Sequence, residues 1–94
     1  MKYENETLNA RERTNGDYEN NAGASQALKR IIKIWSGGRP GGCHFTSMQQ
    51  ESLDLICTKI GRLCSGDPNC KDTWDDIAGY ANLVSERLDG EEED

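Results

Sequence analysis

Apolar residues recur every three or four positions in three stretches of the chain, the spacing that places them on one face of an α-helix. The three stretches are residues 21–35, 47–64 and 73–88. Their apolar stripes consist of Ala24, Leu28, Ile31, Ile32 and Trp35, then Leu53, Ile56, Cys57, Ile60, Leu63 and Cys64, and finally Trp74, Ile77, Ala78, Ala81, Val84 and Leu88. The pattern predicts an all-α fold, a small helical bundle of three main helices.

Helix-breaking residues separate the three stretches. Residues 36–46 hold four glycines and a proline, which predicts a loop, and residues 65–72 are rich in turn-forming residues. Ser47, followed three positions later by Gln50, has the pattern of a capping box at the start of the second helix. Asp72 or Thr73 is the expected cap of the third helix.

The two ends of the chain are polar. Residues 1–20 predict an N-terminal arm with a turn at Asn15-Gly16-Asp17, and residues 89–94, with the sequence DGEEED, predict an acidic, disordered tail. The helical domain is therefore expected to span residues 21–88.

The small apolar content predicts a homo-oligomer. Only 34% of the 94 residues are hydrophobic and 6% are aromatic, so a monomer would have a thin core. Leu55 and Leu83 lie on otherwise polar helix faces, and Gly79 inside a helix indicates close approach of a ligand or a second backbone. We expect the subunit interface at Leu55, Gly79 and Leu83.

The distribution of charge narrows the functional classes. Residues 1–41 carry a net charge of +2 and residues 42–94 carry −8, which together give −6. An acidic half argues against general nucleic-acid binding, although it permits a divalent metal ion or a basic partner protein. No apolar run is long enough to span a membrane, and no signal peptide is evident, so we expect a soluble, cytoplasmic protein whose cysteines are free thiols.

Several cations and aromatic residues are candidates for binding an anionic ligand. Lys29, Arg30 and Lys33 lie within about one turn, where they can contact phosphate or carboxylate groups. Aromatic side chains such as Tyr18, Trp35 and Tyr80 could stack on a base. The candidate ligand-binding residues are Arg11, Arg13, Tyr18, Lys29, Arg30, Lys33, Lys59, Asp75, Gly79 and Tyr80.

Paired carboxylates are candidates for binding Mg²⁺. Glu51 and Asp54 are spaced i, i+3, as are Asp72 and Asp75, with Asp76 adjacent. If the two helices are neighbours, Glu51, Asp54, Asp75 and Asp76 could converge on one ion. A simpler interpretation of Asp75 and Asp76 is that they complement the dipole at a helix start.

Cysteine and histidine offer a different set of metal ligands. Cys43 and His44, with Cys64 and Cys70, could bind zinc, although no CxxC pair occurs. His44 is the single histidine and lies in the glycine-rich loop, which gives little support for catalysis through it.

The segments RERTNGDY, SQALKRIIKIW and QQESLDLICTKIGRLCSGDPNCKDTWDDIAGYANL resemble a group of small helical proteins encoded by tailed phages and prophages. The resemblance covers roughly residues 11–88 and is most specific at residues 74–81, WDDIAGYA. That group has no general assigned activity. The helical layout and paired acids are also similar to the all-α NTP pyrophosphatases (MazG-like proteins), whose ExxE and ExxD helices bind Mg²⁺. The present chain has no ExxE, and its second acidic pair lies at a helix start.

These observations lead to three functional hypotheses. The first is a phage-encoded counter-defence protein that sequesters a nucleotide-like small molecule or immune signal without catalysis and without a cofactor. The second is an acidic inhibitor that binds and blocks a host defence factor, as anti-CRISPR proteins do. The third is a Mg²⁺-dependent nucleotide pyrophosphatase that uses Glu51, Asp54, Asp75 and Asp76.

Overall fold

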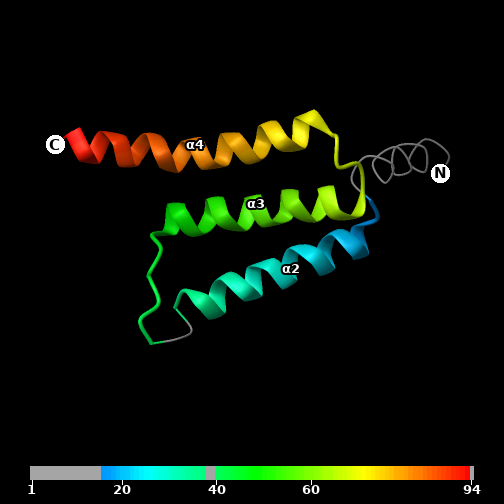
Figure 1. Ribbon diagram of the computed structural model, residues 1–94, viewed down its shortest axis with the longest axis horizontal. Helices are drawn as coiled ribbons and strands as arrows, with labels where there is room; N and C mark the ends of the chain where they lie inside the picture. Colours follow the sequence, from blue (N-terminus) through cyan, green and yellow to red (C-terminus); the bar gives the residue numbers. More distant parts are fainter. Residues whose placement is uncertain (1–15, 38–39, 94) are drawn as a thin grey trace.

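Three antiparallel helices form a single layer in the computed structural model, which describes residues 16–37 and 40–93. The helices are α2 (Tyr18–Trp35), α3 (Ser47–Ser65) and α4 (Lys71–Glu93). Helix α3 lies in the middle and packs against both neighbours, and within the described ranges α2 and α4 make no contact with each other (Figure 1). The predicted all-α, three-helix fold is confirmed, and no other described helix covers either face of the layer.

Helix α2 begins three residues before its predicted start. Asp17 is its N-cap: the Asp17 carboxylate accepts a hydrogen bond of 2.9 Å from the backbone N–H of Asn20. Residues 18–20, which we assigned to the N-terminal arm, therefore form the first turn of α2. Residues 1–15 of that arm, with Arg11 and Arg13, lie outside the described residues.

The capping box of α3 lies one residue before the predicted position. Thr46 is the N-cap, and its hydroxyl accepts a hydrogen bond of 3.1 Å from the backbone N–H of Gln49. The Gln49 side chain accepts one of 2.9 Å from the Thr46 N–H in return. Thr46 and Ser47 are both good caps and each is followed three residues later by glutamine, so the spacing alone does not choose between them.

Helix α4 is longer than predicted at both ends. The backbone N–H groups of Thr73 and Trp74 donate to the carbonyl of Cys70, which places Asp72 and Thr73 inside the first turn instead of at the cap. At the other end the backbone remains helical to Glu93, where we expected a disordered tail from residue 89. Glutamate is a good helix former, which favours this continuation of the helix. None of the described helices is long and apolar enough to cross a membrane.

Small and polar residues, not large apolar ones, lie where the helices cross. Ser25 and Gly61 are buried between α2 and α3, with the hydroxyls of Ser25 and Thr58 3.3 Å apart. A Cβ atom on Gly61 would lie 2.7 Å from the backbone carbonyl oxygen of Asn21, so the two helices approach closely at this point. Among the described residues, Cys57 is the single buried hydrophobic side chain, at 3% exposure.

The turn before α2 packs against the end of α3. Gly16 has a φ of 76°, in the left-handed region that favours glycine, and a Cβ atom there would meet the backbone carbonyl of Ser65. The Ser65 hydroxyl donates to the Asn21 side chain. These contacts join the start of α2 to the end of α3 and explain why the predicted turn contains glycine.

Candidate functional site

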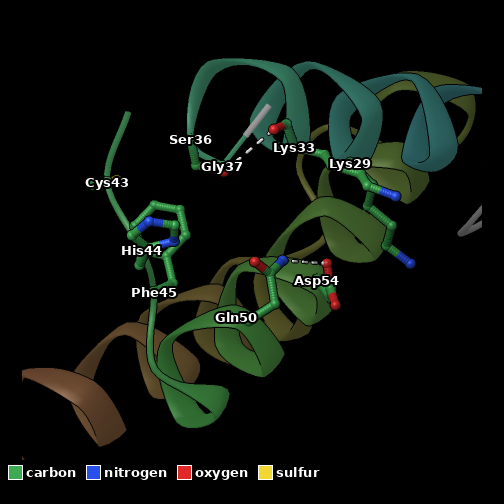
Figure 2. A pocket seen from close by; sticks show the side chains of 9 residues that line it. All are labelled: Lys29, Lys33, Ser36, Gly37, Cys43, His44, Phe45, Gln50 and Asp54. Carbon is green, nitrogen blue, oxygen red and sulfur yellow. Dashed lines mark hydrogen bonds between the residues drawn. The ribbon is translucent and has the colours of Figure 1, made fainter. Parts of the chain in front are cut away.

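A hollow of about 670 Å³ lies between α2, α3 and the loop that connects them. Its volume is within the range of small-molecule binding sites, roughly 300–1,000 Å³. Helix α2 contributes its last two turns, and α3 contributes the residues just after its capping box. The lining residues are Lys29, Lys33, Ser36, Gly37, Cys43, His44, Phe45, Gln50 and Asp54 (Figure 2).

Two cations line the hollow without partners among the described residues. Lys29 and Lys33 are one helical turn apart, and neither ammonium group has an ion pair or a hydrogen bond within the described ranges. Lys59 and Lys71 differ, because they form ion pairs of 2.8 Å with Asp76 and 2.7 Å with Asp75. The positive charge of Lys29 and Lys33 is therefore available to an anionic ligand.

The α3 side of the hollow carries hydrogen-bonding groups. The Gln50 amide donates a hydrogen bond of 3.0 Å to the Asp54 carboxylate. The Thr58 hydroxyl donates to the backbone carbonyl of Asp54 at 3.1 Å. Because a carboxylate has two oxygens and about four acceptor positions, Asp54 retains the capacity to accept from a ligand hydroxyl or amino group.

The loop contributes two rings. Figure 2 shows His44 and Phe45 on one side of the hollow, with Gln50 and Asp54 on α3 and the two lysines on α2. Phe45 is 37% exposed, so part of its ring surface is open to contact. At the C-terminal end of α2, the buried Ser36 hydroxyl donates a hydrogen bond of 2.7 Å to the Ile32 carbonyl. This bond fixes the end of the helix at the point where the loop begins.

The structure brings together a minority of the predicted ligand-binding residues. Lys29 and Lys33 line the hollow, whereas Arg30 is exposed outside it. Tyr18 is at the opposite end of α2, and the remaining described candidates are elsewhere on α3 and α4. These remaining candidates are Lys59, Asp75, Gly79 and Tyr80. Gly79 has nothing within 4 Å of where a Cβ would lie, so no described residue approaches it closely.

The four acids considered for Mg²⁺ do not share a site. Asp54 lines the hollow on the α2 side of α3, whereas Asp76 pairs with Lys59 between α3 and α4. Asp75 pairs with Lys71 on its own helix, and Glu51 is exposed. In the part of the chain that the structure describes, no group of three or more His, Cys, Asp or Glu residues is arranged to hold a metal ion.

A family model matches residues 4–88, nearly the whole chain. The chain belongs to the family described as a domain of unknown function, DUF6378. Comparisons with curated proteins and with solved structures give no match. The match covers all the residues of the hollow, so its lining belongs to the DUF6378 domain.

Most of the residues that line the hollow of this DUF6378 domain were not predicted as ligand-binding residues. Ser36, Gly37, Phe45 and Gln50 line it, yet none was a candidate ligand-binding residue. Cys43 was considered only as a zinc ligand, and His44 as a zinc ligand and as a weakly supported catalytic residue. The one sequence feature that pointed to this hollow was a glycine-rich loop directly after a helix that carries lysines. How that loop folds back on α3 depends on tertiary packing and has no local pattern.

The four cysteines of this DUF6378 domain are free thiols in different environments. Cys43 and Cys64 are exposed and Cys57 is buried. Cys43 is in the α2–α3 loop, and Cys64 and Cys70 flank the α3–α4 turn at the opposite end of the layer (Figure 1). The predicted core position is confirmed for Cys57 and wrong for Cys64. Burial, and secondarily the Asp54 charge, raises the pKa of the Cys57 thiol, while Lys29 opposes this.

We expect Cys57 to be the thiol slowest to react with a disulfide reagent at pH 8. Its burial blocks access, and its raised pKa lowers the thiolate fraction. Mass spectrometry after timed labelling should show Cys43, in the exposed loop, modified first, with Cys57 modified only after addition of urea. Labelling of Cys57 at the rate of Cys43 in native buffer would contradict the burial of Cys57. Because the folded state raises the pKa of the Cys57 thiol, the unfolded chain releases this proton at lower pH than the folded chain does. The free energy of unfolding should therefore fall as the pH rises above 9.0, the ordinary pKa of a cysteine thiol.

Proposed function

We propose that this protein binds a small, anionic, nucleotide-like molecule in the hollow between α2, α3 and their loop, and holds it without converting it. The observation that carries the proposal is the pair Lys29 and Lys33, two cations without partners among the described residues, on the wall of a hollow of about 670 Å³. Surface lysines often extend into solvent, but these two lie one turn apart and line the same concave site.

The other lining groups match the remaining parts of such a ligand. The ammonium groups of Lys29 and Lys33 can bind phosphate, and the Asp54 carboxylate can accept hydrogen bonds from a sugar hydroxyl or a base amino group. The exposed part of the Phe45 ring offers a surface for stacking against a base. A carboxylate beside the lysines disfavours a ligand that is only a phosphate cluster, because it would repel the additional charges.

We further propose a biological setting for this binding. The resemblance to proteins encoded by tailed phages supports a counter-defence role, in which the protein sequesters a nucleotide signal of the host. Sequestration requires affinity and a saturable site, and it requires no catalytic group. The hollow supplies cations, hydrogen-bonding groups and an aromatic ring for binding, and Asp54 is the one carboxylate among its lining residues.

A comparison of two cation-removing substitutions tests the site. Titration calorimetry with a panel of linear and cyclic nucleotides should identify a ligand, and Lys33→Ala should weaken its binding by about tenfold or more, since a charge-assisted hydrogen bond contributes roughly 1.5–3 kcal/mol. Arg30→Ala is the matched control, because it removes one positive charge from the same helix outside the hollow. The ligand should be recovered unchanged after incubation with Mg²⁺.

Three results would count against the proposal. One is the absence of binding and of any thermal shift across the panel at millimolar ligand. A second is an equal loss of affinity in Arg30→Ala and Lys33→Ala, which would indicate attraction by overall charge. The third is hydrolysis of the ligand, which would favour the pyrophosphatase alternative over sequestration.

A further inference from the structure

The apolar residues of all three helices lie on the same face of the layer. In α3, Gly61 contacts α2 and Lys59 pairs with Asp76 of α4, which fixes the two sides of this helix. At about 100° per residue, Leu53 and Ile60 point between those sides, toward one face of the layer. The opposite face of α3 carries polar residues such as Glu51 and Arg62.

Helix α2 presents its apolar residues toward this same face. Ser25 points at α3, where its hydroxyl contacts Thr58. Counted from Ser25 at about 100° per residue, Ala24 and Ile31 lie a little more than a quarter turn to one side, and Lys33 lies to the other. Helices α2 and α3 run antiparallel (Figure 1). With this arrangement, the helical periodicity places Ile31 of α2 and Ile60 of α3 on the same face of the layer.

Helix α4 also presents apolar residues toward this face. The Lys59–Asp76 ion pair marks the polar face of the layer between α3 and α4. Trp74 and Ala78 lie about 160° around the helix from Asp76, so they point toward the apolar face. We name this surface the apolar face, and it consists of Ala24, Ile31, Trp35, Leu53, Ile56, Ile60, Trp74, Ala78, Ala81 and Leu88.

The apolar face is open to solvent in the single chain. Ile31 is 55% exposed, Trp74 54% and Leu88 42%, and the α3 residues Leu53 and Ile60 are only half-buried. The chain exposes 7079 Å², compared with about 5,400 Å² for a compact monomer of this mass. The open single layer therefore leaves more surface exposed than a compact fold of the same mass would.

We infer that the apolar face is the interface of a homodimer, in which a second copy covers it with its own apolar face. Large apolar side chains such as Ile31 and Trp74 are more than half exposed on this face, and a two-fold arrangement lets every apolar residue meet the same kind of surface. Residues 1–15 are poor candidates for the cover, since they hold only four apolar residues, Met1, Tyr3, Leu8 and Ala10. Leu55, Gly79 and Leu83, which we expected at an interface, lie away from this face.

The inferred dimer is independent of the proposed ligand. Lys33 lies on the opposite side of α2 from Ile31, about 160° around the helix, so a second copy on the apolar face leaves the lysines of the hollow accessible. Each chain has a net charge of −6, but the apolar face itself contains no charged residue. Two copies therefore bring their acidic surfaces together only at the rim of the contact.

The dimer is tested by placing one charge on either face. Sedimentation equilibrium of the full chain should give a mass of about 21 kDa, twice the 10.5 kDa of one chain. Ile31→Glu should convert it to a monomer with unchanged helical circular dichroism. Leu83→Glu is the matched control, because Leu83 is 56% exposed, compared with 55% for Ile31, and lies on the polar side of α4.

A second variant on the apolar face tests the dimer independently if Ile31→Glu does not fold. Ala78→Glu introduces a good helix former at an exposed position of the apolar face, so it should also give a folded monomer. A monomeric wild-type chain at 100 µM would overturn the inference. So would a dimer that Leu83→Glu dissociates while Ile31→Glu and Ala78→Glu leave it intact.

Discussion

Gly16→Ala is expected to lower the free energy of unfolding by about 2–4 kcal/mol. Gly16 has a φ of 76°, which costs an alanine roughly 1 kcal/mol or more. The new methyl group would also meet the backbone carbonyl of Ser65, and overpacking of this kind costs about 1–3 kcal/mol. Urea denaturation followed by circular dichroism, at a fixed protein concentration, measures the change.

Gly41→Ala separates the two contributions. Gly41 has a nearly equal φ of 80°, but a Cβ there has nothing within 4 Å. It should therefore show the cost of backbone strain alone, about 1 kcal/mol. An equal loss of stability for Gly16→Ala and Gly41→Ala would mean that the turn before α2 does not pack against the end of α3.

The second large effect is that alanine should change the free energy of unfolding in opposite directions at two helical glycines, Gly61 and Gly79. Gly61→Ala should lower the free energy of unfolding by about 1–2 kcal/mol, because the Cβ would lie 2.7 Å from the backbone oxygen of Asn21 and α2 would have to move. This loss already includes the gain of about 1 kcal/mol from replacing glycine in a helix. Gly79→Ala should instead raise the free energy by about 0.5–1 kcal/mol, since no atom is near.

The same urea titration decides this comparison, because both substitutions add one methyl group to the interior of a helix. Destabilisation by Gly79→Ala would reveal a neighbour at Gly79, such as a second subunit, and would favour the interface that we expected there from the sequence. Stabilisation by Gly61→Ala would contradict the close crossing of α2 and α3.

The three helices could be predicted because each is defined by residues close together in the sequence. Apolar spacing and the glycine-rich breaks identify each helix, and the errors are confined to its ends. At the start of α3, Thr46 and Ser47 have equivalent cap patterns, so the choice depends on the path of the incoming loop. At the end of α4, an acidic sequence is compatible with either a helix or a disordered tail.

The side on which each helix packs could not be predicted in the same way. Hydrophobic spacing marks Ile31 and Trp74 as core residues, yet the structure leaves them exposed and buries Ser25 and Thr73. Helices that cross closely require small side chains at the crossing, and hydrophobicity scales do not measure size. Gly61 was therefore overlooked, while Gly79 was singled out for the role that Gly61 has.

The candidate site was predictable only where one helix supplies it. Lys29 and Lys33 are one turn apart, and this spacing identifies them as neighbours in any helix. Gln50 and Asp54 join them only because α3 folds back antiparallel to α2, and Phe45 joins them through the loop. No local pattern encodes either event.

The open layer has a consequence for how the chain folds. Among the described helices, each packs on its neighbour along the sequence and on no other helix, and the connecting segments, residues 36–46 and 66–70, are short. Forming these contacts requires little loop-closure entropy, which is the condition for rapid folding. Of the two helices in the α2–α3 hairpin, α3 alone contacts α4 within the described ranges. Local opening of α4 can therefore leave the hollow assembled, so that the ligand site and the C-terminal helix belong to separable cooperative units.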